Sequence, residues 1–243
     1  MAVMGDVERV TLDELKRFEA PAGTRTWSPV SHGRVMDMVL STLDMMRLEV
    51  GSMDLAVTKE GQQFFGTLDL TLDIAEGVTL TAGVRNSTDK TFSLGFCCGE
   101  RVMVCSNLCF GSEINVAKKH TAHVEDGFHG DIIKAGMQLR EYGNRSAERI
   151  STLRTVRVTD DQADALLLRA FEIGVVGSRQ LKPLIQEWRE PSYDEFKERN
   201  LWSLVNAFTH VMKPRFESTP LVAASESLAF SRFIEPEVLA CSS

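Results

Sequence analysis

The alternation of apolar and polar residues in FFGTLDLTLDIA, residues 64–75, places the strongest constraint on the fold. Even positions are apolar and odd positions are polar over most of this segment; the two sets are Phe64, Leu68, Leu70, Leu72 and Ile74, and Thr67, Asp69, Thr71 and Asp73. Successive side chains of a strand point to opposite faces of a sheet, so the pattern predicts one buried face and one solvated face. Such a strand is typical of an antiparallel sheet.

Neighbouring segments extend this strand into a sheet. Turn-forming residues, among them Gly99–Glu100, separate short runs of apolar, β-branched and aromatic residues. These runs cover residues 48–57, 77–85, 92–98 and 101–107. We therefore predict an antiparallel meander of four to five strands within residues 48–106.

Helical periodicity flanks the predicted sheet on both sides. Ser31 is a suitable N-cap for a helix before it, and residues 124–153 carry apolar residues at helical spacing, with a break expected near Gly143. Two capping boxes predict further helices, and their residues are Thr159 with Gln162 and Ser192 with Glu195.

These elements predict an α+β protein: an N-terminal helix, the antiparallel meander, then a helical second half packed on one face of the sheet. We divide the chain into an N-terminal arm (1–30), one α+β domain (31–213, with its sheet at 48–106 and its helical part at 124–213) and a C-terminal tail (214–243). No apolar run reaches the roughly 20 residues of a membrane span, and charged residues fill the N-terminus where a secretory signal needs an apolar core. We therefore expect a cytoplasmic protein without a membrane partner, whose five cysteines are free thiols.

The net charge of −7 argues against a protein that coats nucleic acid with its whole surface. Residues 85–157, however, hold 11 Lys and Arg against 8 Asp and Glu, a local charge of +3 that leaves −10 for the rest of the chain. A basic segment in an acidic protein is typical of an anion-binding surface. We predict contacts with single-stranded DNA or RNA by Arg85, Lys90, Arg101, Lys118, Lys119, Arg140, Arg145 and Arg149. The alternative, charges scattered over several solvated faces, stays open.

Three of the five histidines, His120, His123 and His129, lie within ten residues and raise the possibility of a zinc site. Thr121 and Ala122 stand where the HExxH motif of metalloproteases has its Glu, and Gly127–Phe128 separates His129 from the other two. We therefore predict no metal, and keep a metal-dependent hydrolase only as a third hypothesis. The sequence also lacks a GxSxG elbow, a Gly-rich phosphate loop and a dinucleotide fingerprint, so it supports neither an enzyme nor a cofactor.

Short polar motifs resemble a family of phage- and plasmid-encoded proteins that is classified as a domain of unknown function. The family has a Cys-(Thr/Ser)-Asn segment, a basic-His-Thr segment and a helix with Asn-Ala-x-Thr. The matching residues are Cys105, Ser106, Asn107, Lys119, His120, Thr121, Asn206, Ala207 and Thr209. The family helix usually continues with aromatic and His residues, where this chain has His210-Val211-Met212. The resemblance implies a mobile-element origin and no established activity.

The order of the elements is also similar to that of single-strand-annealing recombination proteins, which form oligomeric rings around single-stranded DNA. This is an analogy at the level of the fold, because no motif is shared. It favours a mobile-element protein that binds single-stranded nucleic acid in recombination, replication or protection of invading DNA, as a homo-oligomer. A non-enzymatic inhibitor of a host defence system, which binds a host protein through its acidic ends, is the alternative.

The polar residues of the resembling motifs suggest a structural function. Asn107 follows the last predicted strand, and Asn206 lies close to the apolar stripe of the last predicted helix. Buried polar groups need hydrogen-bond partners. We therefore predict a polar clamp between sheet and helix, in which His120 donates to a backbone carbonyl or to one of its other members, Asn107, Asn206 and Thr209.

Overall fold

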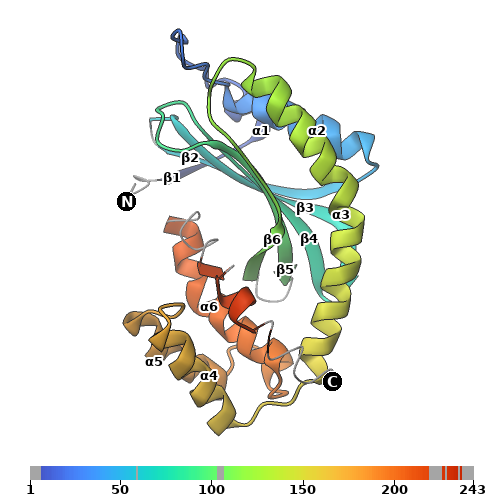
Figure 1. Cartoon of the computed structure of the whole chain (residues 1–243), viewed down its shortest axis with the longest axis vertical. Helices are drawn as coiled ribbons and strands as arrows, with labels where there is room; N and C mark the ends of the chain where they lie inside the picture. Colours follow the sequence, from blue (N-terminus) through green and yellow to red (C-terminus); the bar gives the residue numbers. More distant parts are fainter. Residues whose placement is uncertain are drawn as a thin grey trace. The chain divides into compact units, whose positions relative to one another are not determined.

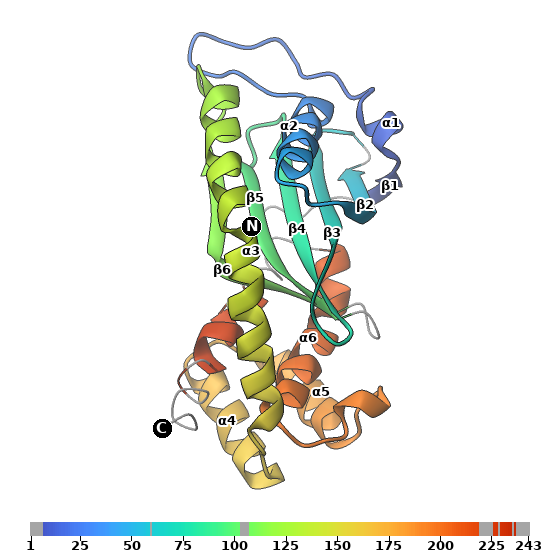
Figure 2. The same cartoon turned by 90° about the vertical axis from the view of Figure 1, so that its right-hand side faces the viewer.

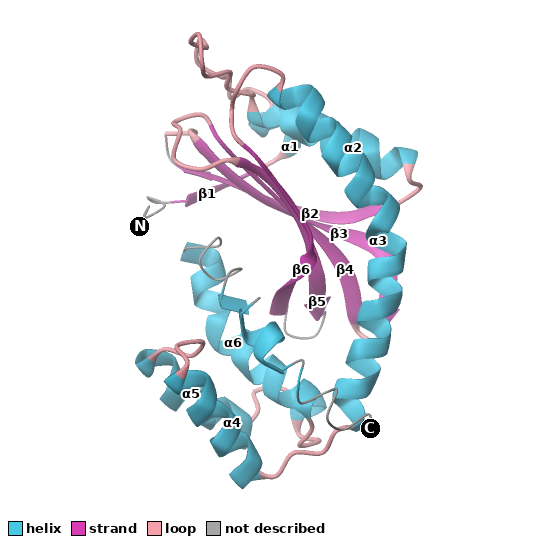
Figure 3. Cartoon of the chain, in the orientation of Figure 1, coloured by secondary structure: helices cyan, strands magenta, loops and turns pink. Residues whose placement is uncertain are grey.

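The fold is an antiparallel six-stranded sheet combined with helices, as a computed structural model shows (Figure 1). The structure describes residues 7–58, 60–102, 107–218, 226, 227, 229–234 and 236, and only the backbone of residues 107–113 and 216–218. Figure 3 separates the strands from the helices by colour. The predicted α+β class is confirmed, and the sheet has more strands than the four to five expected.

Sequence order and spatial order coincide in the sheet, which runs β1-β2-β3-β4-β5-β6. The strands are β1 (Val7–Val10), β2 (Val50–Thr58), β3 (Gln63–Ala75), β4 (Val78–Ser87), β5 (Leu94–Val102) and β6 (Asn107–Lys118). Val57 pairs with Phe64 and Met53 with Leu68, and the register shifts between Val50 and Ser52. Gly77, with φ of 69°, lies between β3 and β4, where the left-handed backbone suits a residue without Cβ.

Two strands differ from the prediction. The predicted turn at Gly99–Glu100 is wrong, because β5 continues through it to Val102. Of the predicted strand at 101–107, Arg101 and Val102 belong to β5 and Asn107 begins β6, whereas residues 103–106 lie outside the described residues. The sheet also gains β6, at Asn107–Lys118. The predicted N-terminal arm contains β1, which pairs Val7 with Thr58 at the edge of the sheet.

The helices begin at the predicted N-caps in two cases. They are α1 (Leu12–Leu15), α2 (His32–Met45), α3 (Val124–Thr155), α4 (Asp160–Glu172), α5 (Ser178–Arg189) and α6 (Leu201–Ser218), with a 3-10 turn at Asp194–Phe196. The Ser31 hydroxyl accepts from the Arg34 backbone N–H at 3.3 Å, and Thr159 and Gln162 cap α4 reciprocally. The predicted break of α3 near Gly143 is wrong, since α3 is one continuous helix.

The second predicted capping box is wrong because another residue binds its serine. The Ser192 hydroxyl donates to Glu187 Oε2 at 2.8 Å, and its backbone N–H donates to Glu187 Oε1 at 2.9 Å. Glu187 belongs to the preceding helix, α5. The helix α6 therefore begins only at Leu201.

The residues group into two compact units. The first comprises Met1–Asp73, Thr79–Gly99 and Ser112–Gly143, and the second comprises Ile74–Val78, Glu100–Gly111 and Asn144–Ser243. The strands β3 to β6 and the helix α3 contribute residues to both units. The predicted single domain and its boundary with the tail remain predictions; that boundary, after residue 213, falls inside α6.

In the first unit, α2 and the first part of α3 cover the same face of the sheet (Figure 2). Phe64, Leu68 and Leu70 of β3 are at most 2% exposed on this face, as the alternation predicts. The two helices come close at Gly136, where a Cβ atom would lie only 3.1 Å from Met46 Cγ. A residue with a side chain at this position would have to displace Met46.

The opposite face of β3 is less solvated than the sequence predicts. Thr67 is only 6% exposed, and Asp69 is half-buried. Asp69 accepts hydrogen bonds from Ser52 on β2, at 2.8 Å, and from Thr81 on β4, at 2.7 Å. This carboxylate therefore joins three strands by cross-strand hydrogen bonds, which explains its position in the middle of the sheet.

The second unit has its own hydrophobic core. Strand ends and helices contribute to it together; its members include Val78, Val102, Ile150, Leu153, Leu167, Leu184, Trp188, Leu204 and Phe208. Arg199, between α5 and α6, donates to the carbonyl oxygens of Trp188 and Arg189 and stacks its guanidinium 4.9 Å from the Trp188 ring centroid. It satisfies carbonyls at the end of α5 that have no partner within the helix.

Candidate nucleic-acid interface

The eight predicted nucleic-acid contacts are divided between the two units. Arg101, Arg145 and Arg149 belong to the second unit, and the other five belong to the first.

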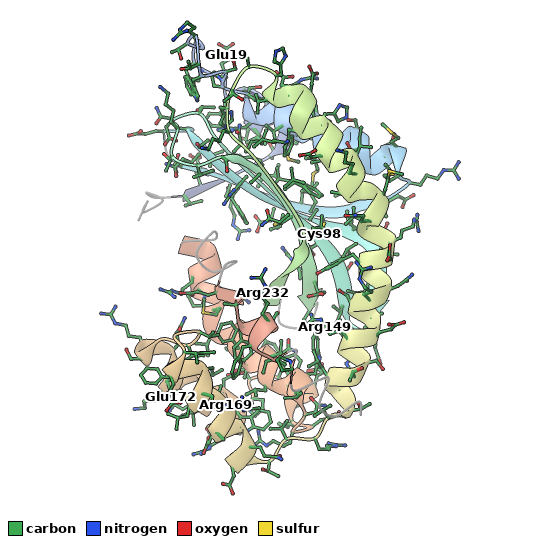
Figure 4. The ribbon with its side chains drawn as sticks, viewed as in Figure 1. Glu19, Cys98, Arg149, Arg169, Glu172 and Arg232 are labelled. Carbon is green, nitrogen blue, oxygen red and sulfur yellow. The ribbon has the colours of Figure 1, made fainter. Side chains whose placement is uncertain are left out.

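Arg149, whose side chain is labelled in Figure 4, forms an ion pair within the second unit. Its Nη2 atom lies 3.1 Å from Oε2 of Glu100, which is only 3% exposed, while Ser146 donates to Glu100 Oε1 at 2.5 Å. Arg101 is half-buried and Arg145 is exposed. The Arg149 guanidinium therefore serves first to neutralise a buried carboxylate, which would be costly to leave unpaired.

Two cations of the first unit are bound to neighbouring residues. Lys118 forms an ion pair with Asp131 at 2.7 Å, which links the end of β6 to α3. The Arg140 Nη2 atom donates to the Arg47 carbonyl at 3.4 Å. Arg47 and Arg140 also line a small pocket of about 210 Å³.

Lys90 and Trp27 form the contact that is most relevant to nucleic acid. The Lys90 Nζ atom lies 4.6 Å from the centroid of the Trp27 indole ring. Lys90 is exposed, and Trp27 is half-buried in a turn closed by Thr24, whose N–H donates to the Trp27 carbonyl at 2.8 Å. A cation beside an aromatic ring is the combination used to bind a phosphate and the base attached to it.

Two further exposed cations accompany this pair, one through the sequence and one through a backbone hydrogen bond. Arg25 belongs to the same turn as Trp27. Lys119 precedes His120, whose carbonyl accepts from the Ser28 backbone N–H at 3.1 Å and so brings Lys119 toward that turn. We call these four residues, Arg25, Trp27, Lys90 and Lys119, the Trp27 surface.

The β4–β5 turn presents Lys90 in a fixed position. Lys90 has φ of 68°, a left-handed conformation that is uncommon for a residue with a side chain. Asp89 accepts from the Thr91 N–H at 2.9 Å and from Gln63 Nε2 at 2.7 Å. Burial alone would raise the pKa of Asp89, but these hydrogen bonds lower it. The carboxylate therefore stays ionised and holds the turn.

Arg85 lies on β4, beside the same turn. Its guanidinium carbon lies 5.9 Å from the Phe92 ring centroid, and burial lowers its pKa. Cys97 lies close to it, and burial raises the pKa of the Cys97 thiol to about 12, which the nearby positive charge only partly offsets. Cys97 and Cys98 are free thiols, as predicted, whereas the other cysteine side chains lie outside the described residues.

His32, the first residue of α2, is held in one neutral form. Its Nε2 atom lies 3.0 Å from the Gly61 carbonyl and must carry a hydrogen to donate. Its Nδ1 atom therefore accepts from Asn86 Nδ2 at 2.9 Å, while the same amide nitrogen donates to the Val30 carbonyl at 2.8 Å. Burial lowers the pKa of His32 to about 4. This network fixes the chain that leads from Trp27 into α2.

The predicted polar clamp is described only in part. Asn206 is 1% exposed and donates to the Trp202 carbonyl at 2.9 Å, and Thr209 donates to the Asn206 carbonyl at 3.1 Å, so these bonds run along α6. His120 is 6% exposed; burial lowers its pKa, and the Ser28 backbone partly offsets this. The Asn107 side chain lies outside the described residues. Both ring nitrogens of His120 are buried and have no hydrogen-bond partner among the described residues, so the predicted donation by His120 is wrong there. The predicted part of Asn107 in a clamp stays a prediction.

The three clustered histidines occupy different environments. His120 is buried, His123 is exposed with φ of 66° immediately before α3, and His129 is half-buried within α3. Among the residues that the structure describes, no group of three or more His, Cys, Asp or Glu is placed to hold a metal ion. Of the described helices, none combines the length and apolar character needed to cross a bilayer.

Sequence reasoning singled out Lys90 and Lys119 but not Trp27. The signal was available in the segment TRTW, where an aromatic residue follows a basic one. Comparisons with protein-family models, with curated proteins and with solved structures found no match, so the resemblance to the phage and plasmid family stays a prediction.

Proposed function

We propose that this protein is a cytoplasmic, mobile-element protein that binds single-stranded nucleic acid at the Trp27 surface. The observation that carries the proposal is the Lys90 ammonium 4.6 Å from the Trp27 ring, with Lys119 and Arg25 exposed nearby. A base can stack on an aromatic side chain whatever its sequence, because every base has a π-face. The three cations would contact the phosphates on either side of that base.

The charge of the protein limits the kind of binding that we propose. With a net charge of −7, the chain attracts nucleic acid only where cations are concentrated. Asp89 precedes Lys90 in the sequence, and its carboxylate accepts hydrogen bonds from Gln63 and Thr91. We therefore propose a short contact of a few nucleotides, with little preference for sequence.

The number of cations sets the expected salt dependence. For a single strand, each phosphate contact makes the slope of log affinity against log salt concentration more negative by about 0.7. Three cations therefore predict a slope of roughly −2. A slope near zero with retained binding would show that the binding does not depend on the three cations.

Fluorescence anisotropy with a labelled single-stranded oligonucleotide at low salt tests the proposal. We expect binding by the unaltered protein, a loss of about tenfold or more for Trp27→Ala, and partial retention for Trp27→Phe, which keeps a stacking ring. Lys134→Ala is the matched control, because Lys134 is an exposed cation on α3 whose side chain is 79% exposed. Absence of binding at low salt would contradict the proposal, and so would equal binding by Trp27→Ala.

The mobile-element origin and a homo-oligomeric state rest on the resemblances alone. In a ring of several copies, the Trp27 surfaces would together contact a longer segment of a single strand. Sedimentation of the protein with and without oligonucleotide tests this part: a single monomeric species in both samples would remove the oligomer but leave the Trp27 surface intact.

A further inference from the structure

A groove between α5 and α6 in the second unit is independent of the Trp27 surface. It has a volume of about 840 Å³, within the range of sites for small ligands. Polar residues line it on both sides; they include Arg179, Gln180, Glu187, Glu190, His210 and Arg215. A groove of this size with several charged groups can bind a polar ligand.

The charges in this groove change sign along α5. Arg179 lies at the start of α5, and Arg215 of α6 lines the same groove. Glu187 and Glu190 lie at the other end of α5. Arg215 forms an ion pair with Glu226 at 2.5 Å, and Glu226 also accepts from Gln180 Nε2 at 3.4 Å. Among the residues that the structure describes, Arg179 forms no ion pair.

In the groove, the basic residue of α5 lies near the start of the helix and the acidic residues near its end, which is the reverse of the charge order that stabilises a helix. The backbone dipole makes the N-terminus of a helix positive and its C-terminus negative, so acidic residues favour the first turn and basic residues the last. The first turn of α5 holds no acidic residue. Arg189 in the last turn pairs with Asp164 of α4 at 2.6 Å.

At one end of the groove two cations, Arg179 and Arg215, accompany one carboxylate, Glu226. At the other end two carboxylates, Glu187 and Glu190, accompany His210. The first end therefore has more positive charge and the second more negative charge.

Hydrogen bonds fix the Glu187 side chain at the negative end of the groove. Glu187 accepts from the N–H and the hydroxyl of Ser192, and its Oε2 atom lies 3.7 Å from His210 Nε2. The other ring nitrogen of His210, Nδ1, is buried and has no partner among the described residues. It can exchange a hydrogen bond with a polar group in the groove.

We propose that this groove binds a short extended peptide with free termini, its carboxylate at Arg179 and its amino group at Glu187 and Glu190. The length of the groove fits this ligand. Arg179 and Glu187 are eight positions apart on α5, a distance of about 12 Å at 1.5 Å per residue. An extended chain of about four residues spans the same distance. Its backbone groups would lie beside His210 and Gln180.

Isothermal titration calorimetry of the full chain with tetra-alanine tests the proposal. We expect the peptide with free termini to bind, and we expect at least tenfold weaker binding when either its amine is acetylated or its carboxylate is amidated. Arg179→Gln should weaken binding of the free peptide but leave the amidated peptide unaffected. Glu190→Gln should behave in the same way toward the acetylated peptide.

Glu172→Gln is the matched control, because Glu172 is exposed on α4 and does not line the groove (Figure 4). Arg179 and Glu190 are also exposed, so their substitution should leave the thermal melt unchanged. Absence of binding, or binding that neither cap affects, would overturn the proposal. The Trp27 surface is untouched by these variants, so failure here leaves oligonucleotide binding as a separate question.

Discussion

The side-chain amide nitrogen of Asn200 lies 3.1 Å from the carbonyl oxygen of Arg154 and ties the end of α3 to the start of α6. The amide oxygen of Asn200 accepts from the backbone N–H of Ser203 at 2.8 Å and from its hydroxyl at 3.0 Å. Asn200 is only 2% exposed. One side chain therefore caps α6 and holds α3 against it, all within the second unit.

Replacing Asn200 with Ala should lower the free energy of unfolding by about 1–3 kcal/mol, because it leaves the Ser203 N–H without its cap. Urea denaturation followed by circular dichroism measures the change. Asn144→Ala, at an exposed position on α3, is the control and should lie within about 0.5 kcal/mol of the unaltered protein. Equal midpoints for the two variants would contradict this prediction.

Removing Arg149 should reduce stability rather than nucleic-acid binding. Arg149→Ala removes a guanidinium from the 3%-exposed Glu100 carboxylate, at a cost of up to about 3 kcal/mol, because Arg149 itself keeps some exposure. Thermal melts and oligonucleotide anisotropy on the same variant separate the two effects. An unchanged melt combined with lost binding would place Arg149 in the interface after all.

Stability should fall as the pH is lowered from about 6.5 to about 4, the ordinary and the folded pKa of His32. The unfolded chain takes up a proton at His32 in this range while the folded chain does not, so protonation favours unfolding. The shift corresponds to about 3 kcal/mol at most, and burial of His120, whose pKa is also lowered, adds to it.

Proton NMR of the His32 ring and urea denaturation at several pH values check this prediction. His32→Gln should be less stable at neutral pH, but its stability should depend less on pH across this range. A His32 ring that titrates near 6.5 in the folded protein would show that the network with Asn86 and Gly61 does not hold the neutral form.

Lys119→Ala should weaken oligonucleotide binding and make the salt slope less negative by about 0.7, the contribution of one phosphate contact. Lys119 is exposed, so the thermal melt should not change. Lys118→Ala gives a useful comparison, since Lys118 is paired with Asp131 and should affect stability more than the slope. If the two variants have the same slope as the unaltered protein, neither lysine contacts a phosphate.

Much of the fold could be predicted from local patterns. The alternation in β3 and the caps at Ser31 and Thr159 were sufficient for their elements, because each depends on neighbours in sequence. The strand β6 is not predicted, although Leu108, Phe110, Ile114 and Val116 alternate with other residues, because the predicted sheet ends at the motif around Asn107. Gly143 suggested a break, but one glycine costs a helix only about 1 kcal/mol, which packing can offset.

The candidate site was harder to predict than the fold. Lys90 and Trp27 are far apart in sequence, and only the folded chain brings them together. The same is true of Glu100 and Arg149, which looked like separate surface charges. Charge counts identify a basic segment, but they do not show which cations are already neutralised by a partner elsewhere in the chain.

The left-handed backbone of Lys90 has a consequence for how this protein can change over evolution. One residue both closes the β4–β5 turn and presents the cation beside Trp27. Glycine or asparagine would suit the turn better but would abolish the charge, whereas other substitutions would lose both. If selection preserves binding, position 90 is therefore restricted to lysine or arginine. Glycine at this position in related chains would indicate that the Trp27 surface has been lost.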